Sequence, residues 1–149
     1  MYDRILVPVD GSDGATAVLE HVGDLARRVD ADVELLFVAD TARDSVTLVE
    51  GDVVDALVRE GEDVLADAAE PLSEVGVDAA TETVQGNPAP TIAEYADLYD
   101  HDLIAMATHG DAGAAGLLGS VTEKVVRLAE TPVLVARLRD DERLPAPYE

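Results

Sequence analysis

Short apolar runs alternate with amphipathic stretches along the chain, a pattern that predicts five strands separated by four helices. Each apolar run is bounded by polar or turn residues and has the length of a strand. Between the first two runs, Val18, Val22, Leu25, Ala26 and Val29 recur at helical spacing, which places them on one face of a helix. The predicted strands cover residues 4–9, 33–38, 77–85, 103–107 and 132–136, and the helices begin near residues 13, 52, 88 and 120.

Cap and breaker residues indicate where these helices begin and where they are weak. Gly86-Asn87-Pro88 supplies a turn, an N-cap and a proline at the first helical position. Ser120 and Glu123 match a capping box, so Ser120 is the expected N-cap of the last helix. Inside the second helix Gly61 is a poor helix former, and Pro71 is expected to bend or split the helix.

Strict alternation of strands and helices is typical of a parallel sheet built with right-handed crossovers. We expect a single α/β domain over residues 1–139, followed by a polar tail at 140–149. Its doubly wound, Rossmann-like sheet has five parallel strands in the order 3-2-1-4-5, with helices on both faces. The third strand is the most polar one, which suits an edge of the sheet.

The net charge of the chain excludes some classes of function. The chain carries 32 Asp and Glu against 10 Lys and Arg, a net charge of −22. Such a field repels nucleic-acid phosphates and excludes DNA or RNA as a partner. With 48% apolar residues the chain is not expected to be disordered. We interpret the acidic surface as halophilic adaptation to a salt-rich cytosol; an ordinary acidic protein is the alternative.

Several other chemistries are excluded by composition. There is no cysteine, hence no disulfide, thiolate metal site or cysteine nucleophile. No apolar run reaches the eighteen residues typical of a membrane span, and the first residues lack the features of a secretory signal. The expected location is therefore the cytoplasm, without a membrane partner.

Ligands of open α/β sheets bind at the carboxyl ends of the strands, where the strand order reverses. Two segments lie there: residues 8–12 after the first strand, and the glycine-rich loop 108–119 after the fourth. Glycines allow backbone N–H groups to approach a ligand closely, and the following helix start favours phosphate. The alternative is that this loop is only a flexible connector.

Several polar residues can be interpreted either as functional or as structural. Asp10 either contacts the ligand or caps the following helix as a turn residue. His109 is expected to structure its loop, since no Ser-His-Asp arrangement makes it a general base. His21 and His101 are expected at the surface, and Tyr95 and Tyr99 in the core. A weaker hypothesis is a Mg²⁺ site, held with a nucleotide by Asp10, Asp13, Asp40 and Asp111.

Four segments, in this order, resemble the universal stress protein family, and the resemblance covers residues 2–137. They are Ile5-Leu6-Val7-Pro8-Val9-Asp10-Gly11-Ser12, Gly86-Asn87-Pro88, Leu103-Ile104-Ala105-Met106-Ala107-Thr108-His109-Gly110, and Leu117 to Val125 followed by Thr131 to Val135. The resemblance implies ATP binding, with Asp10 near the adenine edge and Val38 lining the base pocket. It also implies a homodimer in which the last strand, Pro132–Ala136, pairs with its mate. The expected nucleotide-binding residues are Pro8, Asp10, Ser12, Val38, Ala107, His109, Gly110, Gly119, Ser120 and Val121.

The glycine loop departs from the pattern of the ATP-binding members. Ala107 stands where their first glycine is expected, and eight residues instead of nine separate Gly110 from Gly119. Asp111 follows Gly110 where many members have a basic residue, and its charge would repel phosphates.

Three functions follow as hypotheses. The first is a regulatory domain that binds ATP, with Mg²⁺ as an accompanying ion, and responds to stress through nucleotide-dependent interactions. The alternative is a nucleotide-free homodimeric interaction module of the same fold. A small hydrolase is the least supported, because no catalytic residue stands out; slow ATP hydrolysis or autophosphorylation is the most that we expect.

Overall fold

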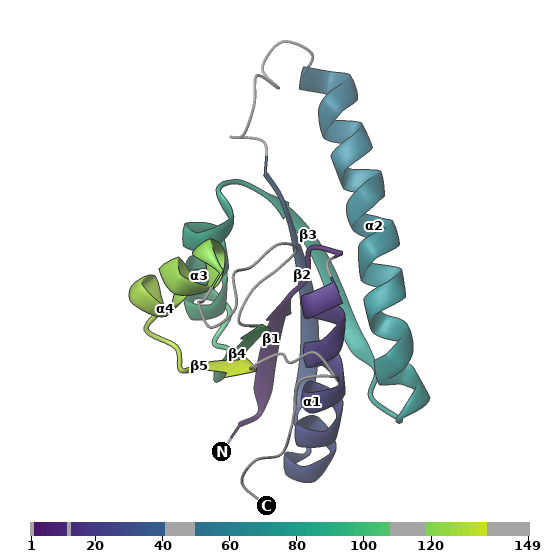
Figure 1. Ribbon diagram of the computed structural model, residues 1–149, viewed down its shortest axis with the longest axis vertical. Coiled ribbons are helices and arrows are strands. Elements are labelled where there is room, and N and C mark those ends of the chain that lie inside the picture. Colours follow the sequence, from purple (N-terminus) through teal and green to yellow (C-terminus); the bar gives the residue numbers. More distant parts are fainter. Residues whose placement is uncertain (1, 12, 41–49, 108–118, 137–149) are drawn as a thin grey trace, which may run out of the picture.

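The computed structural model describes residues 2–11, 13–40, 50–107 and 119–136 (Figure 1). Strands and helices alternate without exception in these ranges. The elements are β1 (Arg4–Pro8), α1 (Asp13–Val29), β2 (Asp32–Ala39), α2 (Glu50–Glu74), β3 (Ala79–Gln85), α3 (Pro88–Leu98), β4 (Leu103–Ala107), α4 (Ser120–Leu128) and β5 (Val133–Ala136).

All five strands form one parallel sheet in the order β3-β2-β1-β4-β5, which confirms the predicted topology. The first strand in the chain is thus the central strand of the sheet. Ile5 pairs with Val33 of β2 on one side and with Leu103 of β4 on the other. The strand order reverses at β1, so the carboxyl ends of β1 and β4 mark the expected ligand edge.

Helices cover both faces of the sheet, α1 and α2 on one and α3 and α4 on the other (Figure 1). Successive strand residues point to opposite faces, so alternate residues belong to different cores. Ile5 and Val7 pack with α1 and α2, whereas Leu6 between them packs with α3 and α4. All three side chains are fully buried, which explains why β1 reads as an unbroken apolar run.

The edge position of β3 also agrees with its composition. Its residues are either exposed or half-buried, and none is fully buried. The strand begins at Ala79, two residues later than the pattern predicts. An edge strand is covered by fewer neighbours, so polar side chains such as those of Thr81 and Glu82 remain in water.

Helix α2 continues through both of its unfavourable residues. Pro71 lies inside the helix, so the prediction that it splits the helix is wrong. The buried side chains of Leu65 and Leu72 hold the segment against the sheet, and this packing outweighs the lost backbone hydrogen bond. Gly61 permits close contact with β2, because a Cβ atom there would lie 2.5 Å from Cδ2 of Phe37.

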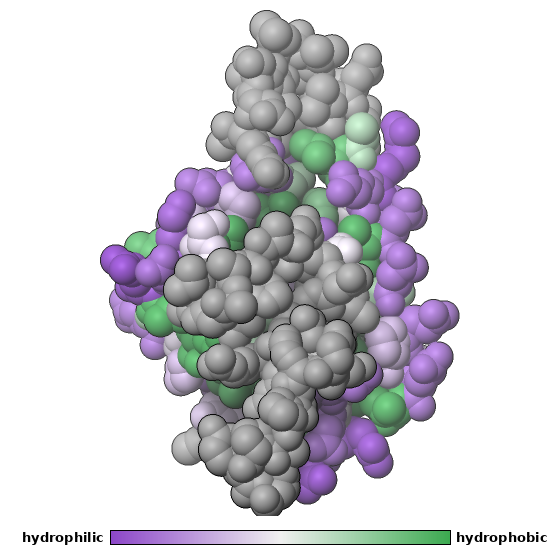
Figure 2. All heavy atoms as spheres, viewed as in Figure 1, coloured by the Kyte–Doolittle hydropathy of each residue, from purple (hydrophilic) through white to green (hydrophobic). Residues whose placement is uncertain are grey.

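The surface of α2 is strongly acidic. Figure 2 shows a largely hydrophilic border along the outer side of this helix, where Glu60, Glu62, Asp67 and Glu70 are exposed. Within the described residues, no helix is both long and apolar enough to cross a membrane.

Candidate ligand edge of the sheet

Three strand ends and one helix start meet at the carboxyl edge of the sheet. Because Ile5 pairs with Leu103, β1 and β4 run side by side and end at nearly the same level, at Pro8 and Ala107. Val38 lies close to the end of β2 and is half-buried. The structure therefore brings these three predicted site residues to one edge.

A buried hydrogen bond joins the start of α4 to the end of β4. The Thr122 hydroxyl donates to the carbonyl oxygen of Ala107 at 2.9 Å. Thr122 is 6% exposed and Ala107 9%, so this contact is shielded from water. It fixes the first turn of α4 relative to the strand that precedes it in the chain.

The start of α4 differs from the prediction by one residue. Gly119 is the N-cap, with φ −65° and ψ 156°, and its carbonyl accepts the Glu123 N–H at 2.9 Å. Ser120 is the first helical residue, and no side chain caps this end, so the predicted Ser120–Glu123 capping box is wrong. The extended backbone ends at Gly119, which places the Ser120 hydroxyl inside the first turn.

This helix start has the properties of an anion site. The first backbone N–H groups of a helix have no partner within the helix, and the dipole adds positive potential there. Ser120 and Val121 are exposed and Gly119 half-buried, so a ligand can approach them. The φ angle of Gly119 is one that any residue can adopt. Glycine therefore matters at this position because it leaves space for a ligand, and not because of its backbone conformation.

The turn after β1 brings Asp10 to the same edge. Just before it, the Val9 N–H donates to the Leu36 carbonyl at 2.9 Å, which prolongs the contact between β1 and β2. Gly11 follows with φ +85°, a conformation that side chains disfavour. Asp10 is exposed in this turn, so both interpretations of it, ligand contact and turn residue, remain open.

Other predicted site residues lie outside the described residues: Ser12, His109, Gly110 and Asp111. Across the ranges that are described, no three His, Asp or Glu side chains come close enough together to hold a metal ion. The described residues thus give the Mg²⁺ hypothesis no geometric support.

Thr122 was missed by sequence reasoning, although the sequence contained a signal. It lies three residues before the buried Val125, on the apolar face of α4. A hydroxyl at a position facing the core needs a hydrogen-bond partner. The identity of that partner, a carbonyl 15 residues earlier, could not be read from spacing.

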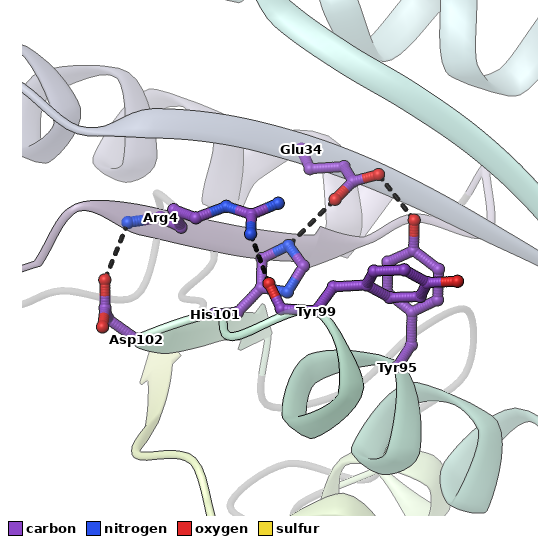
Figure 3. A network of polar contacts seen from close by, with 6 residues as sticks. All are labelled: Arg4, Glu34, Tyr95, Tyr99, His101 and Asp102. Atoms are coloured by element: carbon purple, nitrogen blue, oxygen red, sulfur yellow. Dashed lines mark hydrogen bonds and ion pairs between the residues drawn. The ribbon is translucent and has the colours of Figure 1, made fainter.

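A second polar cluster joins the early part of β2 to α3 and to the turn between α3 and β4 (Figure 3). Glu34 accepts hydrogen bonds from the Tyr95 hydroxyl at 2.6 Å and pairs with His101 Nε2 at 2.9 Å. His101 is 6% exposed, so its predicted surface location is wrong: a carboxylate from β2 provides its buried partner. Burial, and then the Glu34 hydrogen bond and charge, raise the pKa of Tyr95 far above its ordinary value.

The imidazole of His101 is the most buried part of this cluster. The second imidazole nitrogen, Nδ1 of His101, is buried and has no hydrogen-bond partner among the described residues. Tyr99 is 47% exposed and contacts Tyr95 ring to ring, so its predicted core location is wrong, whereas Tyr95 is half-buried. The cluster anchors α3 to the sheet, away from the carboxyl edge.

The fold and this edge together define a doubly wound α/β domain in which a helix start lies beside the strand ends at the topological switch point. The sequence matches the model of the universal stress protein family over residues 1–137, and the chain belongs to this family. It is 36% identical to the universal stress protein MJ0531 of Methanocaldococcus jannaschii, over 92% of this chain and 83% of the relative. It is 30% identical to the universal stress protein YxiE of Bacillus subtilis, over 92% of this chain and 100% of that protein.

Solved structures agree with this assignment. The structure of MJ0577 from M. jannaschii superposes with a TM-score of 0.83 at 32% identity, covering 94% of this chain and 99% of that one. UspA from Lactobacillus plantarum gives 0.80 at 30% identity, with 91% and 98% covered. A universal stress protein in complex with cAMP gives 0.72 at 26% identity, with 91% and 97% covered.

Proposed function

We propose that this protein is a regulatory domain that binds an adenine nucleotide, ATP in the first place, at the carboxyl edge of its sheet. The observation that carries the proposal is the uncapped start of α4, tied by Thr122 to the end of β4 beside β1. Free N–H donors at a helix start are a common phosphate site. The relative in complex with cAMP supports an adenine ligand.

In this proposal the base lies against Val38 and Pro8, with Asp10 at its polar edge. The phosphates lie against the N–H groups of Gly119, Ser120 and Val121. Mg²⁺ would accompany the nucleotide, and turnover would be slow at most. Binding and release would change the interactions of the protein under stress.

Isothermal titration with Mg-ATP on the Gly119→Val variant tests the site. A side chain at this position enters the space needed by the phosphates, so the affinity should fall roughly fivefold or more. The backbone angles of Gly119 allow valine, and melting curves would verify that the variant is folded. Glu62→Gln, an exposed change on α2, is the control and should bind as the unmodified protein does.

Asp111→Arg provides the complementary test, because it removes a charge that opposes phosphate and adds one that attracts it. It should strengthen binding, most visibly at low salt. Equal affinity of the unmodified protein and Gly119→Val would place the nucleotide elsewhere. Undetectable binding, even in Asp111→Arg, would favour the nucleotide-free interaction module.

The second candidate, a homodimeric module, rests on exposed apolar side chains of the last strand and of α4, the helix before it in the chain. β5 is an edge strand in which Leu134 is 38% exposed, and Val126 and Leu128 of α4 are 45% and 52% exposed. An apolar strand edge of this kind is usually covered or paired. We propose a homodimer through residues 132–136, and a monomer by light scattering at micromolar concentration in molar KCl would contradict it.

A further inference from the structure

We propose that Thr122 is a positioning residue for nucleotide phosphates: its hydroxyl holds the N–H groups of α4 at the carboxyl edge. This inference rests on the proposed function of that edge. Thr122 is the third helical residue, and its hydroxyl donates to the carbonyl of Ala107 at 2.9 Å. It touches the last residue of β4 and belongs to the same helical turn as the exposed Ser120 and Val121.

Within the described part of the chain, the buried side chains of α4 that hold this turn are few. Only two residues of α4 are buried, Thr122 and Val125. Val125 packs into the core formed with α3, by apolar contact that has no preferred direction. The hydrogen bond of Thr122 is directional, and it is buried, so water cannot replace it. It therefore fixes the rotation and height of the first turn on the sheet.

The exact position of these N–H groups matters more for the binding of a ligand with phosphates than for the binding of one without them. Phosphate oxygens need N–H donors within hydrogen-bond distance and in suitable directions. A base that lies against Val38 and Pro8 depends on β1 and β2, whereas the hydroxyl of Thr122 bonds to β4. Loss of the hydroxyl should therefore affect the binding of phosphate-bearing ligands selectively.

The variant Thr122→Val tests the proposal because valine has nearly the same shape without the hydroxyl. Isothermal titration should show ATP affinity reduced by roughly fivefold or more, and adenosine affinity changed by less than about twofold. Thr122→Ser keeps the hydroxyl and should restore ATP binding. Lys124→Gln, an exposed change two residues further along α4, is the surface control on the same helix and should leave the discrimination between ATP and adenosine unchanged.

The possible outcomes separate this inference from the proposed function. If the unmodified protein binds neither ATP nor adenosine, the proposed function is wrong and the inference falls with it. If it binds ATP and Thr122→Val binds equally well, the inference alone is wrong. An equal loss for ATP and adenosine, or no rescue by Thr122→Ser, would mean a merely structural role and would also overturn it.

Hydrogen exchange in the unmodified protein gives a test that does not depend on the folding of a variant. ATP should slow amide exchange at Ser120 and Val121, whereas adenosine should leave it unchanged. Protection of these amides by both ligands to the same extent would contradict selective positioning toward phosphate.

Discussion

At the scale of single residues, Asp102 joins two segments that lie far apart in the sequence. Its Oδ2 atom accepts the N–H groups of Asp3 at 2.8 Å and Arg4 at 2.9 Å, about a hundred residues earlier in the chain. Beside it, the Arg4 guanidinium donates to the Tyr99 carbonyl (Figure 3). These contacts hold the entrance of β1 against β4 and against the end of α3.

The two backbone hydrogen bonds lower the pKa of Asp102 below its usual value, because they favour the charged carboxylate. A lowered pKa in the folded state contributes stability above the unfolded-state pKa of about 3.9. That contribution is lost as the pH falls through the folded-state pKa. We therefore expect Asp102→Asn to melt at a lower temperature than the unmodified protein at pH 7, with the difference shrinking as the solution is acidified toward pH 3.

Thermal melts at several pH values would check this expectation. Asp100→Asn is the matched control: it removes the same charge two residues away, from a side chain that has no hydrogen-bond partner within the described part of the chain. A melting difference for Asp102→Asn that is independent of pH would show that the charge of this carboxylate is not what stabilises the contact.

Residues of this kind mark the limit of what the sequence can predict. The strand ends Pro8 and Ala107 follow from local pattern, and the structure places both at the expected edge. His101 and Thr122 owe their environment to Glu34 and to the Ala107 carbonyl, which are distant along the chain. Periodicity describes which face of an element a residue occupies, but it does not identify the partner across that face.

At the scale of elements, the least obvious feature is the closeness of α2 to β2. A glycine in the interior of a helix costs about 1 kcal/mol relative to alanine, yet Gly61 is buried in the middle of α2. A Cβ atom there would lie 2.5 Å from Phe37, which is closer than carbon atoms can pack. Although glycine is a weak helix former, it is the residue that allows α2 to pack this closely against β2.

Gly61→Ala should for this reason destabilise the protein, although alanine is the better helix former. Overpacking typically costs about 1–3 kcal/mol, which exceeds the gain of about 1 kcal/mol in helix propensity. We expect a loss of about 1 kcal/mol in the free energy of unfolding, measured with urea.

The Phe37→Leu background controls for the contact itself. If the phenylalanine ring is the obstacle, Gly61→Ala should become neutral or stabilising when leucine replaces it. A stabilising effect of Gly61→Ala in the unmodified protein would mean that α2 can move away from β2 at little cost.

The order and type of all elements were predictable, because each strand and helix carries its own periodicity. The finer boundaries were less predictable. Ser120 has the composition of an N-cap, but the extended backbone ends one residue earlier, at Gly119. Pro71 has the chemistry of a helix breaker, but tertiary packing on both sides keeps α2 continuous.

At the scale of the whole molecule, the most prominent property is the excess of negative charge. A net charge of −22 on 149 residues places many carboxylates at the surface, and their mutual repulsion opposes the compact state. Salt reduces this repulsion, since the Debye length falls from about 10 Å at 0.1 M to about 3 Å at 1 M. The melting temperature should accordingly rise from low salt to molar KCl.

A variant with Glu60, Glu62 and Glu70 of α2 changed to glutamine is the suitable comparison, because these side chains are exposed on one helix. It should melt higher than the unmodified protein at low salt and gain less on addition of KCl. A melting temperature that stays constant or falls as KCl is added would contradict both the repulsion argument and the halophilic interpretation.

The central position of β1 also governs the order of folding while the chain is being synthesised. β1 emerges from the ribosome first, and β2 can pair with one of its edges as soon as α1 has followed. The other edge has no partner until β4, which begins at Leu103, has been made. Throughout that interval the central strand of the finished protein presents open backbone groups, to which an unfinished neighbouring chain could add a strand.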